Sequence, residues 1–381
     1  MRIVCDQNIP YAARAFGRLG EVTLVEGRAL SAQSVREADA LLVRSVTPVN
    51  AGLLDGSRVR FVGTATIGFD HVDVAYLAGR GIGFATAAGS NANSVAEYVV
   101  AALLEVAADL GWDLASKALG VVGVGNVGRR VVRYAEALGM PVLPNDPPRR
   151  RAEGGSHWVD LATVCTEADV VTLHVPLTRT GEDATLHLFD AGRIARMKPG
   201  AMLINTARGA VVRGDALRGA LEAGELAAAV LDVWEGEPDI DTALLERVAL
   251  GSPHVAGYSL DGKAAGVQMM HDALCGHFGV VDAWDVRSLL PAPQTPEVAV
   301  DGTADPPTAL RDALRGVWDL RRDDAALREM RDRPPEQRGR YFDRLRKDYP
   351  VRREWHNTRT QVVPPRAEIA RTLANLGFRT G

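Results

Sequence analysis

The chain is poor in cysteine. It has three cysteines among 381 residues, and Cys5, Cys165 and Cys275 are widely separated along the sequence. A disulfide framework or a cysteine-rich metal site needs more of these residues at closer spacing, so we expect neither, and no metal. Isolated thiols are typical of a reducing compartment, which favours the cytoplasm.

The chain also lacks a long apolar run. Its most hydrophobic helical stretch, residues 95–110, is interrupted by Glu97, Glu105 and Asp109, whereas a membrane-spanning helix needs roughly 20 apolar residues. The first residues, MRIVCDQNIP, do not follow the charged and then apolar order of a signal peptide. We therefore expect no membrane association.

A strong excess of one charge is absent too. The formal net charge is -4 at pH 7, which gives no general attraction to nucleic acid or to an anionic membrane. The segment after residue 309 is rich in arginine but mixes both signs, as in RRDDAALRE. We expect it to form a small domain that packs on a second subunit rather than a nucleic-acid-binding arm.

Short β-branched runs alternate with helical segments along most of the chain, which is typical of parallel α/β sheets. A first series contains RIVCD, VTLVE, ADALLVRS, RVRFVGTA and GIGFATA, and a second contains ALGVVGVG, PVLPND, ADVVTLHVP, AMLINTA, LAAAVLDVW and VALGSPH. The helical stretch NSVAEYVVAALLEVAADLGW connects them, and a proline-rich connection follows Leu289. The sequence thus predicts two α/β domains and a smaller third one.

The second series opens with a glycine-rich turn. Gly123, Gly125 and Gly128 have G-x-G-x-x-G spacing between a strand and a helix, which is typical of a pyrophosphate-binding turn. Asp146 follows the next strand, where a carboxylate accepts hydrogen bonds from ribose hydroxyls and repels a 2′-phosphate, so NAD is favoured over NADP. The arginines at 149–151 are either solvated loop charges or a weak NADP feature.

Three further segments place polar residues at the ends of predicted strands, where open α/β sheets bind ligands. These are NTARGAVV, LDVWEGEP and SPHVAGYS. Oxidation of an alcohol by NAD requires a base for the hydroxyl proton and a cation for a neighbouring carboxylate. We predict that His254 is the base, that Arg208 is the cation, and that Glu237 raises the pKa of the imidazole.

These motifs, in this order, resemble the D-isomer-specific 2-hydroxyacid dehydrogenase family. The resemblance implies a Rossmann NAD-binding domain, residues 94–256, inserted in a flavodoxin-like parallel-sheet substrate domain, residues 1–93 and 257–285. The tail segments WDLRRDDAALR and RREW resemble one branch of the family, whose members oxidise a phosphorylated four-carbon 2-hydroxy acid. That branch implies a homodimer joined through a small C-terminal α+β domain, here residues 286–381.

Further residues match positions that bind ligands in the family. Val175 stands where the branch usually has a hydroxyl, so any contact of Val175 with NAD is through backbone or packing. Ile67 and Gly68 offer backbone amides to a carboxylate at an expected helix start, and His174 is expected to be structural. The resemblance implies substrate contacts at Ser45, Thr66 and Tyr258, and cofactor contacts at Gly123, Gly125, Asn126, Val127, Gly128, Asp146, Val175, Thr206, Ala207, Arg208, Asp232 and Gly257.

Alternatives within and outside enzymology stay open. A related enzyme acting on 3-phosphoglycerate, glyoxylate or hydroxypyruvate has the same catalytic residues, and some relatives are NAD-sensing corepressors. For the substrate phosphate the candidate cations are Arg44 and, if the tail reaches a cleft, Arg352 and Arg353.

Overall fold

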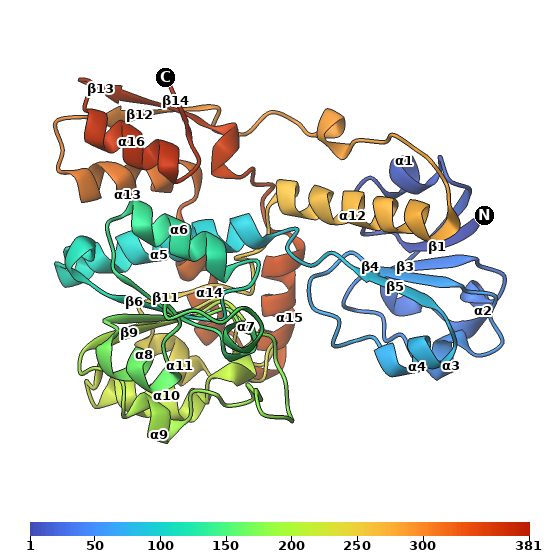
Figure 1. The fold of residues 1–381 in the computed structure, drawn as a ribbon, viewed down its shortest axis with the longest axis horizontal. Helices are drawn as coiled ribbons and strands as arrows, with labels where there is room; N and C mark the ends of the chain where they lie inside the picture. Colours follow the sequence, from blue (N-terminus) through green and yellow to red (C-terminus); the bar gives the residue numbers. More distant parts are fainter. The chain divides into compact units, whose positions relative to one another are not determined.

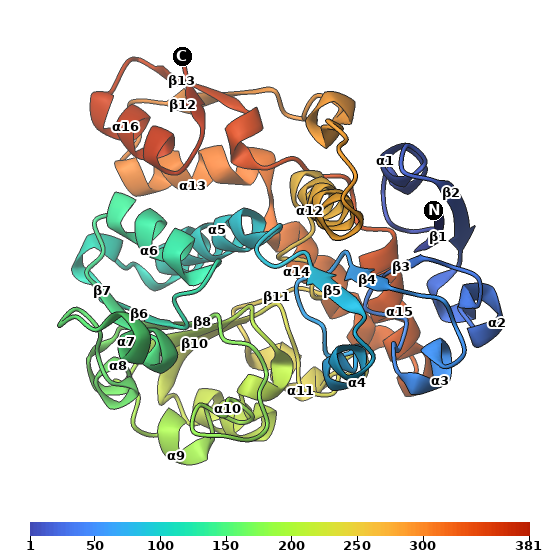
Figure 2. The ribbon, with the colours of Figure 1, turned by 45° about the vertical axis from the view of Figure 1, so that its right-hand side comes forward.

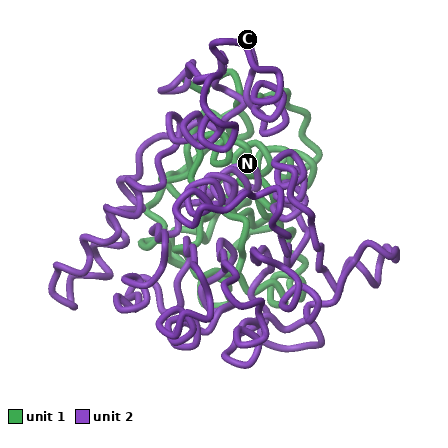
Figure 3. The backbone as a smooth tube through the Cα atoms, turned by 90° about the vertical axis from the view of Figure 1, so that its left-hand side faces the viewer, with its two compact units in different colours: residues 1–91, 258–291 green, residues 92–257, 292–381 purple.

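The computed structural model describes residues 1–381, which form two compact units (Figure 1). Unit 1 comprises Met1–Asn91 and Tyr258–Pro291, and unit 2 comprises Ala92–Gly257 and Ala292–Gly381 (Figure 3). No helix has the length and apolar character needed to cross a membrane. Each unit is built on a parallel sheet, so the predicted α/β class is confirmed.

Unit 1 has a five-stranded parallel sheet in the order β2-β1-β3-β4-β5, the flavodoxin-like order. Alternate residues of each strand enter opposite cores: Ile3 packs with Val267 and Met270 on one face, and Val4 packs with Val35 on the other. The strands are β1 (Arg2–Asp6), β2 (Glu21–Val25), β3 (Ala40–Val43), β4 (Phe61–Thr64) and β5 (Gly83–Thr86). The helices are α1 (Ala12–Phe16), α2 (Ala32–Val35), α3 (Ala51–Leu54), α4 (Val74–Gly79) and α12 (Leu260–Phe278).

Helix α12 returns the chain to unit 1 and covers β4 and β5. It begins at the N-cap Ser259, whose hydroxyl accepts a hydrogen bond from the Gly262 amide at 2.9 Å, and it ends at Gly279, which has a left-handed φ of 66°. Both ends of α12 therefore lie within residues 257–285, the segment expected to return to the substrate domain.

Unit 2 contains a six-stranded parallel sheet in the order β11-β10-β9-β8-β6-β7. The chain starts in β6 and proceeds outward first to β7 and then, in the opposite direction, to β8. Ligands of open α/β sheets bind outside the carboxyl ends of strands at such a switch point. The strands are β6 (Leu119–Val122), β7 (Val142–Asn145), β8 (Val170–Leu173), β9 (Ala201–Asn205), β10 (Leu226–Leu231) and β11 (Leu250–Gly251).

Helices cover both faces of this sheet (Figure 2). On one face lie α5 (Ala92–Leu110) and α6 (Gly128–Ala137). On the other lie α8 (Leu161–Glu167), α9 (Ala191–Ile194), α10 (Gly214–Glu222) and α11 (Thr242–Arg247), and α7 (Pro147–Glu153) follows β7. Val121 and Val230 face the first layer, whereas Val122 and Leu231 face the second, as the two-residue period of a buried strand requires.

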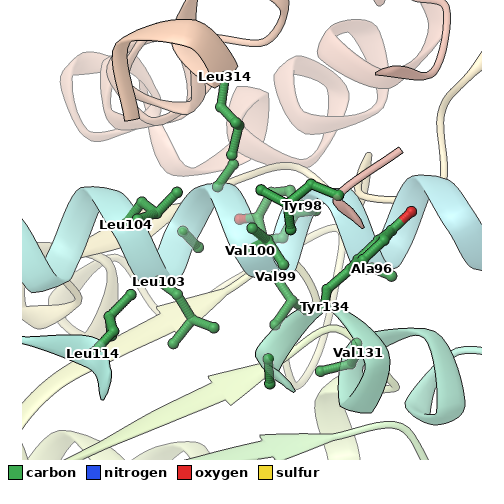
Figure 4. Close-up of a cluster of buried hydrophobic side chains, with 14 of the residues drawn as sticks. Ala96, Tyr98, Val99, Val100, Leu103, Leu104, Leu114, Val131, Tyr134 and Leu314 are labelled. Atoms are coloured by element: carbon green, nitrogen blue, oxygen red, sulfur yellow. The ribbon is translucent and has the colours of Figure 1, made fainter. Parts of the chain in front are cut away.

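The C-terminal part of unit 2 has a parallel sheet of its own, in the order β12-β13-β14. It also shares cores with the six-stranded sheet: Leu314 packs on α5 beside Tyr98 and Leu104 (Figure 4), and Phe342 belongs to the core on the opposite face. The division into three domains stays a prediction. The elements are β12 (Glu297–Asp301), α13 (Pro306–Val317), α14 (Leu320–Arg328), α15 (Pro335–Lys347), β13 (Arg359–Val363), α16 (Ala367–Asn375) and β14 (Arg379–Thr380).

Candidate active site

His254 and Glu237 form a close pair in unit 2. His254 Nδ1 lies 2.6 Å from Glu237 Oε1, and both side chains are partly buried. The pair joins the loop after β10 to the segment after β11. With Nδ1 engaged by the carboxylate, Nε2 is the ring nitrogen that can accept a proton from a substrate.

Glu237 is ionised at neutral pH. Burial raises its pKa, but the hydrogen bond with His254 and the positive charges of His254 and Arg346 outweigh burial, so the pKa lies below the ordinary value. The backbone amide of Trp234 also donates to Glu237 Oε2 at 3.3 Å. A charged carboxylate in this position binds His254 Nδ1 and thereby orients the ring.

Asp232, directly after β10, holds the segment that carries His254. Its buried Oδ1 accepts hydrogen bonds from the Ser252 hydroxyl at 2.6 Å, the Val255 amide at 2.7 Å and the Ala256 amide at 3.0 Å. His254 itself has a φ of 59°, and its amide donates to the Asp232 carbonyl at 2.7 Å. The left-handed backbone of a non-glycine residue is uncommon and needs such support from its surroundings.

Arg208 lies in the turn after β9. Its guanidinium donates from Nη1 to the Ala207 carbonyl at 2.7 Å, and the Asn205 side chain donates to the Arg208 carbonyl at 3.0 Å. A Cβ atom on Gly209 would lie 1.9 Å from the Trp234 carbonyl oxygen, so only glycine permits this approach. The contact joins the Arg208 turn to the loop that carries Glu237.

The glycine-rich turn has the shape that NAD requires. Gly123 has a φ of 88°, and a Cβ atom there would lie 2.8 Å from the His174 carbonyl. A Cβ atom on Gly128 would lie 2.0 Å from the Gly123 oxygen, whereas one on Gly125 would meet no atom within 4 Å. The first and third glycines are thus needed by the protein, and the second leaves open space where a pyrophosphate would bind.

Asp146 connects this turn to the end of β7. Its Oδ2 accepts from the Val124 amide at 2.9 Å, and its Oδ1 accepts from the Arg149 amide at the start of α7. The three neighbouring arginines are each paired with an acid: Arg149 with Glu153, Arg150 with Asp160, and Arg151 with Asp183. Paired arginines do not form an open 2′-phosphate site, and the residues present therefore fit NAD.

The other predicted cofactor residues surround the same strand ends. Val175 packs against Gly123, since a Cβ atom on that glycine would lie 2.9 Å from Val175 Cγ1. Thr206 Oγ1 lies 3.3 Å from His174 Nδ1, and burial lowers the pKa of His174 to about 3, so that imidazole stays neutral. Asn126 and Val127 lie in the glycine-rich turn before α6, Ala207 lies beside Arg208, and Gly257 is the last residue before the chain enters unit 1.

The predicted substrate residues belong to unit 1. Ser45 and Thr66 follow the carboxyl ends of β3 and β4, and the Tyr258 ring lies 4.5 Å from Lys263 Nζ. Thr66 Oγ1 donates to the Gly68 carbonyl at 2.9 Å. The expected helix start at Ile67 and Gly68 is wrong: Ile67 lies in a bend, Gly68 lies in irregular structure, and α4 begins only at Val74, because Asp73 provides its N-cap.

Sequence reasoning did not find several polar residues around His254. Ser252, Ser94 and Tyr98 are buried, and their hydroxyls form hydrogen bonds near the His254 segment. A single serine on an apolar helix carries no local signal of such a role. Arg352, a candidate for the substrate phosphate, is instead buried in an ion pair with Glu97 at 2.8 Å.

A Rossmann sheet with a histidine–carboxylate pair at its strand ends defines an NAD-dependent dehydrogenase of hydroxy acids. The chain belongs to the D-isomer specific 2-hydroxyacid dehydrogenase family, whose NAD binding domain matches residues 82–256. A domain of unknown function (DUF3410) matches residues 289–377. The resemblance inferred from the sequence is thus confirmed, and NAD is the cofactor.

Its relatives identify a branch of this family. The chain is 49% identical over 378 residues to erythronate-4-phosphate dehydrogenase of Edwardsiella ictaluri (strain 93-146), and 47% identical over 377 residues to that of Azotobacter vinelandii (strain DJ / ATCC BAA-1303). Both matches cover 99% of each protein. Among solved structures, D-lactate dehydrogenase from Aquifex aeolicus, complexed with NAD and lactic acid, matches 73% of this chain and 96% of its own, with 25% identity and a TM-score of 0.61.

Proposed function

We propose that this protein oxidises 4-phospho-D-erythronate at C2 with NAD and forms (R)-3-hydroxy-2-oxo-4-phosphobutanoate, a step in the synthesis of pyridoxal 5′-phosphate. The observation that carries the proposal is the His254–Glu237 pair, 2.6 Å apart, after neighbouring strands of an NAD-binding sheet. Whole-length similarity to erythronate-4-phosphate dehydrogenases supports the choice of substrate.

The proposed chemistry assigns one task to each residue. NAD, when bound, supplies the hydride acceptor. His254 Nε2 removes the proton of the C2 hydroxyl, and Glu237 orients the imidazole and stabilises its positive form. Arg208 binds the substrate carboxylate, for which a guanidinium is suited because it donates two parallel hydrogen bonds.

The substrate itself contacts further residues in this proposal. Ser45, Thr66 and Tyr258 are substrate contacts, and Arg44, directly beside Ser45, is our candidate for the phosphate. The buried ion pair of Arg352 with Glu97 argues against a second phosphate ligand at that position.

The substrate choice is tested by following NAD reduction with three acids. We expect 4-phosphoerythronate to give a higher kcat/KM than 3-phosphoglycerate, because the enzyme would be matched to the longer chain, and glycerate to be poorest because it lacks a phosphate. A preference for 3-phosphoglycerate or glycerate would overturn the proposed substrate and leave the dehydrogenase class intact.

The role of His254 is tested by substitution. His254→Ala should lower kcat by roughly 10²–10⁴, the usual contribution of a general base, while the affinity for NAD changes little. NAD binding is measured by fluorescence titration and turnover by absorbance. Unimpaired turnover in this variant would remove the assignment.

We also propose that the protein is a cytoplasmic homodimer joined through its C-terminal segment. Its three cysteines are free and buried, which fits a reducing compartment. In the sheet β12-β13-β14, Val363 of the central strand is exposed, which makes it a suitable position at which to test a contact through this sheet. Light scattering should give about twice the chain mass of 40.8 kDa, and Val363→Asp should shift it to one chain mass. A monomeric wild-type protein would contradict this.

A further inference from the structure

Hydrogen bonds connect the C-terminal part of unit 2 to both ends of the segment that carries His254, directly at one end and through Ser94 of α5 at the other. We name residues 251–257 the histidine segment. Gly251 is the last residue of β11, an edge strand, so its outward amide has no neighbouring strand. Asp324 of α14 supplies the acceptor instead: its Oδ1 lies 2.8 Å from the Gly251 nitrogen. Helix α14 thus closes the sheet edge directly before His254.

A second residue of α14 fixes Asp324 and the approach to β11. Arg328 donates from Nε to Asp324 Oδ2 at 2.8 Å. It also donates from Nη1 to the Leu245 carbonyl at 2.7 Å and from Nη2 to the Val248 carbonyl at 2.8 Å. Because one planar guanidinium donates to three acceptors, it restricts the conformation of residues 245–248, which precede the histidine segment.

At the other end of the segment, Ser94 of α5 connects the backbone to the tail. Its hydroxyl donates to the Ala256 carbonyl at 2.6 Å and accepts a hydrogen bond from Arg352. Arg352 is held in turn by Glu97, 2.8 Å away, and by the Trp318 ring, whose centroid lies 3.6 Å below the guanidinium carbon. Because all four side chains are buried, the connection is protected from competition by water.

The histidine segment has reason to need this support. His254 has a φ of 59°, a conformation that a non-glycine residue keeps only where contacts impose it. Asp232 binds the segment from the sheet side through Ser252, Val255 and Ala256. On the tail side, Asp324 binds Gly251 directly and Arg352 reaches Ala256 through the Ser94 hydroxyl, so His254 lies between two external supports.

We propose that Asp324 and Arg352 are positioning residues: acting through Gly251 and Ser94, they hold the histidine segment in the conformation in which His254 meets Glu237. The C-terminal segment then has a task in the chemistry of its own chain, besides any part in the dimer. The inference rests on the proposed role of His254.

The test compares two variants that each lose one buried hydroxyl. Ser94→Ala removes the link to Ala256, whereas Thr358→Val, the control, removes a buried hydroxyl that donates to the Thr295 carbonyl at 2.7 Å within the tail. We expect both to lower the Tm modestly, and Ser94→Ala alone to lower kcat by about tenfold. Its acidic limb should also move to lower pH, because a loosened His254–Glu237 pair favours the protonated imidazole less.

Asp324 offers a rescue by a conservative change. Asp324→Ala should lower kcat, and Asp324→Asn should recover part of it, because the amide oxygen still accepts from Gly251 whereas the amide nitrogen no longer accepts from Arg328. In the protein without NAD, amide exchange at Val255 and Ala256 should quicken in Ser94→Ala and not in Thr358→Val.

Equal kcat, pH profile and exchange in Ser94→Ala and Thr358→Val would overturn the positioning role. A His254→Ala variant with full turnover would instead overturn the proposed function, so the two failures are distinguishable.

Discussion

At the scale of single residues, the site depends on which groups carry charge. Glu237 keeps its charge because the hydrogen bond and positive charge of His254 outweigh the effect of burial on its pKa. His174, which follows β8 of the same sheet, is neutral because burial lowers its pKa to about 3 and no acidic side chain offsets the effect of burial. Two histidines of one sheet therefore differ in whether a carboxylate lies beside the ring.

Glu237→Gln tests the electrostatic part of this pair. An amide keeps the size and one oxygen of the side chain but no longer stabilises the protonated imidazole. We expect the acidic limb of kcat/KM against pH to move to lower pH, with a smaller loss of kcat than in His254→Ala. An unmoved limb would mean that Glu237 only orients the ring.

His174 gives the protein a stability that depends on pH. Its pKa is about 3 in the folded protein and 6.5 in the unfolded chain, so the unfolded chain binds the proton first. The contribution is present above pH 6.5 and is lost as the pH falls from 6.5 towards 3, by about 1.4 kcal/mol per unit. Between pH 7.5 and 5.5, denaturant unfolding should show a larger loss in wild type than in His174→Asn. Equal losses would contradict the prediction.

At the scale of elements, the turns after the strands determine the site. The Gly209 turn contacts the Trp234 carbonyl and thereby brings the Arg208 turn against the loop of Glu237. Gly219 lies in the middle of α10, and a Cβ atom there would have no other atom within 4 Å. The close contact thus requires glycine at position 209, whereas the space around position 219 would also accept alanine.

Gly209→Ala should therefore lower both stability and activity. A Cβ atom would lie 1.9 Å from the Trp234 oxygen, and the backbone shift this forces costs about 1–3 kcal/mol. Gly219→Ala is the control, expected to stabilise α10 by up to about 1 kcal/mol. Thermal melts and kcat check both. A Gly209→Ala enzyme with wild-type Tm would contradict the close contact.

The sequence predicted the elements whose signals are local. Gly123, Asp146 and His254 each follow or precede a strand that its own residues reveal, so a pattern sufficed for their placement. No helix begins at Ile67, because the N-cap of α4 is Asp73, six residues further along the chain. Ser94 escaped prediction because its partners, Ala256 and Arg352, are distant along the chain.

At the scale of the whole molecule, the chain of unit 2 is interrupted. Residues 92–257 and 292–381 build one unit, although the segment between them belongs to unit 1. The sequence indicated a change of composition after Leu289 but not that the tail completes the cores on both faces of the nucleotide-binding sheet. Phe342, for example, packs in the core on one face of that sheet, and no periodicity in the sequence around it reveals this tertiary contact.

Deletion of residues 292–381 should accordingly prevent folding of unit 2 rather than merely dissociate a dimer. It would expose the face of α5 on which Leu314 packs and leave Glu97 without Arg352. We expect loss of a cooperative melt and of NAD binding, measured by circular dichroism and fluorescence. Removal of Gly381, the exposed last residue after β14, is the control and should leave both intact. A truncated protein that still melts cooperatively and binds NAD would contradict this.

The buried ion pair of Glu97 has a consequence for synthesis on the ribosome. Glu97 accepts hydrogen bonds from Arg352 at 2.8 Å and from the Trp355 amide at 2.8 Å, and these partners follow it by 255 and 258 residues. Until they emerge, the carboxylate has the Asn93 side-chain amide on its own helix, 2.9 Å away, but no counter-charge, and burying it in that state is costly. The strands of the nucleotide-binding sheet are therefore translated before residues 352–355, and Glu97 of α5 gains its counter-charge only late in synthesis.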